Sequence, residues 1–146
     1  MKDIANEYFN VVMKQPVPEP REYINNMISL WEKVKDNYLE VFNTHLIVND
    51  IIIYSLKIGD LDLAEKWAKI SLGYEGNTYL LGEGYFALGE VMYAKGDMEK
   101  AKEYFTKVYE NSKSRLFKGK NPEYLKLIGK KIWASGKEIV GRRNQK

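Results

Sequence analysis

The chain of 146 residues contains no cysteine and a single histidine, His45. The absence of cysteine excludes disulfide bonds and thiolate metal sites, and it is compatible with a reducing compartment. No nucleophile motif accompanies the histidine, and a metal site would need further ligands such as a second histidine or a paired carboxylate–histidine motif. We therefore expect a protein that is not an enzyme and that holds no metal or cofactor.

Long apolar runs are also lacking. The most apolar stretch, residues 46–56, is interrupted by Asn49 and Asp50 and is too short to cross a bilayer. The first residues, MKDIANEYFNVVMKQ, carry charges within their apolar run and show no cleavage-site pattern. The glycine-rich stretch 73–89 lacks the Lys-Ser/Thr of a phosphate-binding loop. We expect a cytoplasmic protein with no membrane contact and no small-molecule substrate.

Charge is present but unevenly distributed. The net charge is +3, yet residues 1–112 hold 12 Lys/Arg and 18 Asp/Glu, whereas residues 113–146 hold 11 Lys/Arg and 2 Asp/Glu. A split of this kind indicates either an anionic partner or contact between the two parts of the chain. It is also typical of a basic, solubilising end of a repeat protein.

Two corners of the chain repeat one another. The segments LKIGDLDLAEKWAK (56–69) and YAKGDMEKAKEYFTK (93–107) both place Gly-Asp before an acidic first turn, 37 residues apart. Glycine ends a helix because it enters the left-handed region without steric cost, and aspartate caps the next helix by accepting a bond from a free amide. Apolar residues recur at helical spacing on both sides of each corner. The sequence therefore predicts two helical hairpins, as in stacked repeat proteins.

Residues 85–108, YFALGEVMYAKGDMEKAKEYFTKV, resemble a tetratricopeptide repeat. Residues 88–89 match the Leu-Gly pair of that family, residues 96–97 match its turn, and Ala101 matches the small residue where the two helices touch. An earlier unit, at about residues 45–78, matches in part. The resemblance implies an all-α fold: a short right-handed α-solenoid of stacked antiparallel helical hairpins, with an N-terminal helical hairpin and a C-terminal capping helix.

We expect a single domain over residues 1–146 with four parts. These are N-terminal helices over 1–44, a first repeat over 45–81, a second repeat over 82–118, and a basic terminal helix or partial third repeat over 119–146. The terminal helix is expected to start at Asn121 and Pro122 and to be broken near Gly136.

The N-terminal part is expected to form two helices. A first helix over 3–14 places Ile4, Tyr8 and Val11 on one side, and a proline-rich connector, QPVPEP, follows. The second helix carries a narrow apolar stripe: Ile24, Met27, Trp31, Val34, Tyr38 and Val41. This stripe either packs on the first repeat or forms a dimerisation seam.

The resemblance implies that the first helix of each unit lines a concave surface that binds a peptide or a partner helix. The positions assigned to it are Asn49, Ile53 and Leu56 in the first unit, Glu83, Phe86, Glu90 and Tyr93 in the second, and Lys126, Lys130 and Trp133 in the terminal helix. The mixture of aromatic and charged side chains is typical of an interface. In the alternative, the N-terminal helices fill the groove and bury Ile53, Phe86 and Trp133.

The leading functional hypothesis is an adaptor or regulatory module that binds a protein or peptide partner, with a homodimer as one form of this. One alternative is an anion- or nucleic-acid-binding module that uses the basic C-terminal segment. Its lysines are spread around the helix and match no nucleic-acid module, so nucleic acid is not expected to be the main partner. Another alternative is an inhibitor that occludes a partner enzyme.

Overall fold

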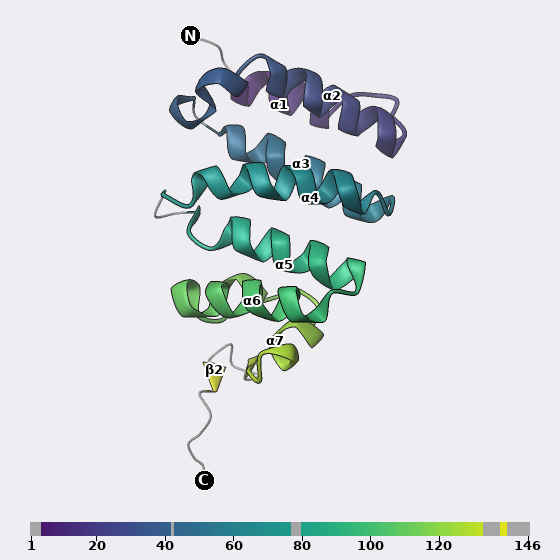
Figure 1. The fold of residues 1–146 in the computed structure, drawn as a ribbon. Helices are drawn as coiled ribbons and strands as arrows, with labels where there is room; N and C mark the ends of the chain where they lie inside the picture. The colour runs from purple at the N-terminus through teal and green to yellow at the C-terminus, as the bar shows by residue number, and fades with distance from the viewer. Residues whose placement is uncertain (1–3, 42, 77–79, 133–137, 140–146) are drawn as a thin grey trace. The chain divides into compact units, whose positions relative to one another are not determined.

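The computed structural model describes residues 4–41, 43–76, 80–132 and 138–139, and these residues are helical apart from turns and one pair of two-residue strands (Figure 1). The prediction of an all-α fold is confirmed at this level. The chain divides into two compact units, residues 1–74 (unit 1) and 75–146 (unit 2). In the described part of the chain, no helix is long and apolar enough to cross a membrane. The expected single domain and solenoid stacking stay predictions.

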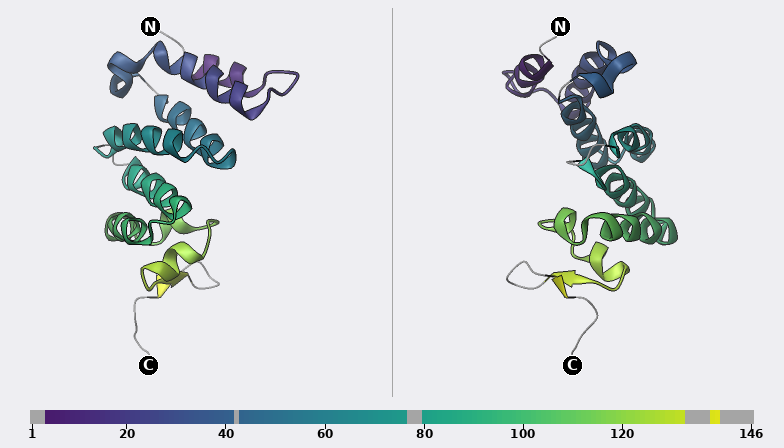
Figure 2. Two further views of the ribbon diagram at one scale, coloured as in Figure 1. Left: turned by 45° about the vertical axis from the view of Figure 1, so that its right-hand side comes forward. Right: turned by 90° about the vertical axis from the view of Figure 1, so that its left-hand side faces the viewer.

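Unit 1 begins with a hairpin of α1 (Ile4–Val12) and α2 (Pro20–Glu32), which lie side by side and are joined by the proline-rich connector (Figure 2). Pro20 stands in the first turn of α2, where a missing N–H costs nothing. The helix expected to carry the apolar stripe as far as Val41 ends at Glu32, so that part of the prediction was wrong. Of the stripe, Ile24, Met27, Trp31 and Val34 are buried in unit 1, and Tyr38 and Val41 are half-buried. The stripe is therefore not available as a dimerisation seam.

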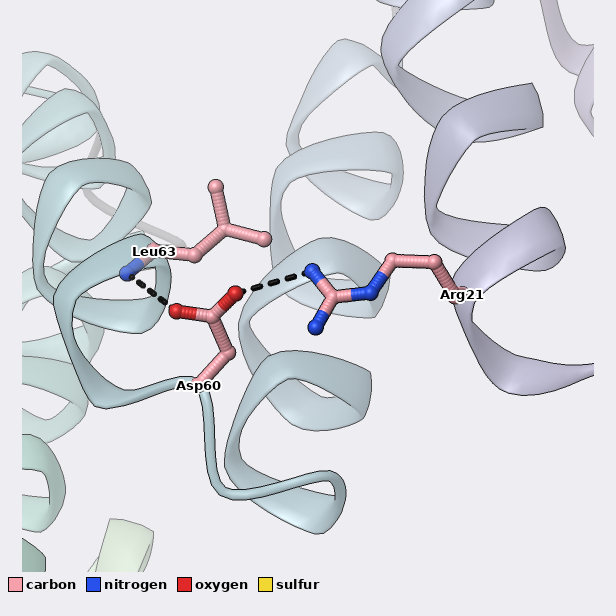
Figure 3. A network of polar contacts seen from close by, with 3 residues as sticks. All are labelled: Arg21, Asp60 and Leu63. Atoms are coloured by element: carbon pink, nitrogen blue, oxygen red, sulfur yellow. Dashed lines mark hydrogen bonds and ion pairs between the residues drawn. The ribbon is translucent and has the colours of Figure 1, made fainter.

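The first repeated corner joins α3 (Thr44–Lys57) to α4 (Leu61–Ser71). Gly59 has a φ of +77°, and the Asp60 carboxylate accepts a hydrogen bond from the Leu63 amide at 3.2 Å, as the Gly-Asp pattern predicts. The same carboxylate accepts a bond from the Arg21 guanidinium at 2.8 Å, so α2 is tied to the start of α4 (Figure 3). The pKa of Asp60 is lowered from its usual value, mainly by the hydrogen bond from Arg21 and to a smaller extent by the bond from the Leu63 amide.

Two short 3₁₀ helices complete unit 1, η1 (Lys35–Glu40) and η2 (Leu72–Tyr74). The buried Thr44 hydroxyl bonds the Tyr38 carbonyl at 2.8 Å and the Tyr74 hydroxyl at 2.6 Å. Burial raises the pKa of Tyr74 to about 12. These bonds connect both 3₁₀ helices to the start of α3.

The second repeated corner joins α5 (Glu83–Lys95) to α6 (Met98–Ser112) in unit 2. Gly96 has a φ of +86°, and the Asp97 carboxylate accepts a bond from the Lys100 amide at 3.1 Å. Ala101 is fully buried, as expected for the small residue at the helix crossing. The start of α5 is capped from a distance, because the two Glu75 carboxylate oxygens accept bonds from the Gly82 and Gly84 amides at 2.7 and 2.9 Å.

The C-terminal part differs from the predicted capping helix. A 3₁₀ turn, η4 (Arg115–Phe117), leads to a short helix, α7 (Glu123–Leu127), and the helix ends there because Gly129 adopts a φ of +75°. Strands β1 (Lys131–Ile132) and β2 (Glu138–Ile139) then pair antiparallel. The prediction of a helix that continues toward Gly136 was wrong, since a left-handed glycine stops it one turn after it starts.

Candidate functional site

The expected groove position Phe86 is part of the core of unit 2. Its side chain is 6% exposed, and its ring lies 5.5 Å from that of Phe105, 5.3 Å from Phe117 and 5.9 Å from Tyr124, measured between ring centroids. Phe117 and Tyr124 belong to η4 and α7. The prediction that Phe86 lines an open concave surface was therefore wrong. The residues found on its ring belong to the C-terminal segment and not to the N-terminal helices of the alternative prediction.

The neighbouring positions Glu90 and Tyr93 are covered by the same segment. The Tyr124 hydroxyl donates to the Glu90 carboxylate at 3.4 Å, and the Tyr124 ring lies 5.1 Å from that of Tyr93. Burial raises the pKa of Glu90, while the positive charge of Lys120 and the Tyr124 hydrogen bond lower it in part. Burial also raises the pKa of Tyr124. This pair is a structural contact between α5 and α7.

The remaining predicted positions do not form one face. Glu83 is half-buried in the first turn of α5, and the exposed Lys126 pairs with Glu123 at 3.1 Å. Lys130 follows the end of α7, so it cannot share a helical face with Lys126, and its ammonium lies 5.1 Å from the centre of the Tyr109 ring. Trp133 lies outside the described residues.

In unit 1, one predicted position is clearly exposed. Ile53 on α3 is 46% exposed, whereas Asn49, one turn before it, and Leu56 are both half-buried. An isoleucine exposed to this degree is not remarkable alone, because single apolar side chains are common on protein surfaces. Ile53 becomes relevant as part of an interaction surface because α1, which contacts α3, also exposes apolar side chains.

Sequence reasoning missed an exposed apolar stripe on α1. Four side chains form this stripe, the α1 arc: Ala5, Phe9, Val12 and Met13. All four are exposed, with Phe9 at 57% and Met13 at 55%. Met13 belongs to the same helical row, because its amide donates to the Phe9 carbonyl at 2.9 Å. The spacing of 5, 9 and 13 is itself a helical period, and could have been noticed beside that of 4, 8 and 11.

The rotation of α1 about its axis exposes this arc. Glu7, Asn10 and Lys14 turn toward α2, where with Asn26, Ser29 and Lys33 they line an open cleft of about 400 Å³. Ion pairs span this cleft, from Glu7 to Lys33 at 2.6 Å and from Lys14 to Glu22 at 3.9 Å. This side of α1 also carries the half-buried Val11, which lines the same cleft, and the apolar side chains on the opposite side of the helix are left in solvent.

A part-buried hydrogen-bond network around Asp50 fixes the rotation of α1 about its axis. The Asp50 carboxylate of α3 accepts hydrogen bonds from the Tyr8 hydroxyl of α1 at 2.9 Å and from the Tyr23 hydroxyl of α2 at 2.7 Å. The Tyr23 ring also packs at 4.4 Å from that of Tyr54. Burial, with the hydrogen bond to Asp50, raises the pKa of both hydroxyls, which stay protonated as donors. The Asp50 carboxylate therefore holds both α1 and α2 in place on α3.

Chemical sites are not evident in the described residues. Within them, no group of three or more histidine and acidic side chains could hold a metal ion, and His45 is half-buried with its ring 6.1 Å from that of Tyr74. In the basic segment, Lys113 and Lys130 lie over the Tyr109 ring and Lys120 lies over the Phe86 ring. These lysines therefore lie against aromatic rings of unit 2.

The chain was compared with protein-family models, with curated proteins and with solved structures, and none of the three comparisons found a match.

Proposed function

We propose that this protein is a cytoplasmic binding module for another protein chain, an adaptor or regulatory module built from helical hairpins of the tetratricopeptide-repeat type that stack as a short solenoid. The observation that carries the proposal is the α1 arc. Its apolar side chains face solvent, whereas polar side chains of the same helix, such as Glu7 and Asn10, line the cleft beside α2. Large exposed apolar side chains gathered on one helix are typical of interaction sites.

The surface continues from α1 to α3. The Tyr8–Asp50 hydrogen bond holds the two helices together, and Ile53 stands one turn after Asp50 on α3. We group the arc with Ile53 and the half-buried Asn49 as the α1–α3 surface, on the first helices of the N-terminal hairpin and of the first repeat. This supports binding through first helices, as the repeat resemblance implies, at a place where the described residues of unit 1 leave apolar side chains exposed.

Burial of this surface supplies the driving force. Each large apolar side chain that passes from water into a packed interface contributes up to ~1.5–3 kcal/mol. The rings in the equivalent part of unit 2 are covered by the chain itself, which leaves unit 1 as the better candidate for a partner. A partner helix with its own apolar stripe fits a surface made from the sides of helices.

Site-specific photo-crosslinking tests the proposal. A photoreactive phenylalanine analogue at position 9 is compared, in cells of the native host, with the same analogue at position 39, because Leu39 is also exposed, at 61%, but lies on η1. We expect a discrete protein product from position 9 that Phe9→Asp weakens when the purified components are titrated. Identical products from both positions would contradict the proposal.

A further inference from the structure

The order of side chains along α1 indicates what covers the arc. We infer that the occupant is α1 of a second copy of this chain, packed antiparallel across a two-fold axis that passes near Phe9. The inference rests on the proposed function, because it names the partner of the same surface. A two-fold interface requires a surface that is complementary to itself, and the arc has this property.

Its side chains are complementary in size. Ala5, Phe9 and Met13 follow one another at intervals of four residues and form one row along the helix. When two such rows pack antiparallel about Phe9, Ala5 of each copy lies opposite Met13 of the other. A small side chain then meets a long, flexible one at both ends, and the two Phe9 rings meet in the middle.

The charges around the arc also fit a second copy. Two charged side chains line the cleft from this part of the chain: Glu7 of α1 is paired with Lys33, and Lys14, just after α1, is paired with Glu22. Two exposed amides, Asn6 and Asn10, stand between the arc and the cleft, and Asn10 also lines the cleft. Among the described residues of α1, two copies therefore bring no like charges together at the arc, and none of these residues offers a charge there that would select an acidic or basic partner instead.

The size of the arc sets the expected strength. A standard interface covers ~800 Å² on each partner, and one aromatic side chain buries ~150–250 Å². Four side chains, of which Val12 is 41% exposed, provide less than a standard interface. We therefore expect a reversible dimer, with a dissociation constant on the order of 10–100 μM.

The absence of cysteine permits a direct test on the full chain. Ala5→Cys and Met13→Cys keep the Phe9 ring, and antiparallel packing brings position 5 of one copy next to position 13 of the other. Under mild oxidation near the dissociation constant, the mixed pair is expected to form a disulfide-linked heterodimer several-fold more than either variant alone. Leu39→Cys, exposed on η1, serves as the matched control for random collisions.

The outcomes are distinct. Preferential mixed cross-linking that is lost when Phe9→Asp is added to both variants supports the second copy, provided that far-ultraviolet circular dichroism shows unchanged helix content. Cross-linking no greater than that of Leu39→Cys overturns it. If position 9 photo-crosslinks to a different protein while the mixed pair does not link, the second copy is overturned and the proposed function stands. Absence of both products overturns both.

Discussion

At the scale of single residues, the close packing of the Phe105 ring on Gly89 reverses the effect on stability that helix propensity alone predicts for Gly89→Ala. A Cβ built on Gly89 would lie 2.5 Å from a carbon of the Phe105 ring. In an exposed helix, alanine is favoured over glycine by about 1 kcal/mol. Here overpacking costs ~1–3 kcal/mol, so Gly89→Ala should lower the urea midpoint of unfolding. Gly76→Ala is the control: no atom lies within 4 Å of the new Cβ, so this change should not lower the urea midpoint. A Gly89→Ala variant as stable as the native chain would contradict the close packing of Phe105 on Gly89.

Glu90 provides a test of the covered face of α5 through pH. Burial raises its pKa above the ordinary 4.5, so folding favours the protonated carboxyl and stability falls as the pH rises through and above that value. Glu90→Gln should therefore gain stability relative to the native chain between about pH 4 and pH 7, measured by urea unfolding. Asp60→Asn should do the reverse, because the pKa of Asp60 is lowered. A difference for Glu90→Gln that does not change with pH would indicate a solvated carboxylate.

At the scale of elements, local signals predicted the two repeated corners and not the C-terminal part. Gly-Asp fixes a corner within a few residues, and both aspartates cap as expected. The terminal helix was overestimated because helical spacing continues past Leu127, whereas Gly129 turns the backbone into the left-handed region. The packing of η4 and α7 on α5 involves pairs of rings that are far apart in the chain, such as Phe86 and Phe117. A local sequence pattern does not predict contacts of this kind.

The short C-terminal elements are expected to be part of the core of unit 2. Phe117 is 3% exposed and packs against the rings of Phe86 and Phe105, so Phe117→Ala should cost ~3–5 kcal/mol of unfolding free energy. Phe9→Ala removes the same side chain from an exposed position and should change stability by about 0.5 kcal/mol or less. Urea titrations followed by circular dichroism compare the two. Equal losses would show that the C-terminal segment does not belong to the core.

At the scale of the whole molecule, the fold class could be predicted from the sequence and the candidate site could not. Periodicity reveals that α1 is a helix, but α1 has apolar side chains around more than half of its circumference, so its rotation is undetermined locally. The contacts that set the rotation, Tyr8 to Asp50 and Glu7 to Lys33, join residues 42 and 26 positions apart. The resemblance to a repeat family placed the groove on the first helices and could not show which part the chain fills itself.

Binding of a second copy of the chain at the α1 arc can be followed directly in the methionine methyl groups. Met13 lies in the arc and is 55% exposed, whereas Met98, at 39%, is exposed at the start of α6 in unit 2. Carbon-13 methyl NMR of the full chain, from about 5 to 500 μM so as to span the expected dissociation constant, follows both groups in one spectrum. We expect the Met13 signal to shift with concentration, Phe9→Asp to abolish this shift, and the Met98 signal to stay in place. A stationary Met13 signal across the range, or a shift of Met98 alone, would contradict binding of a second copy at the arc.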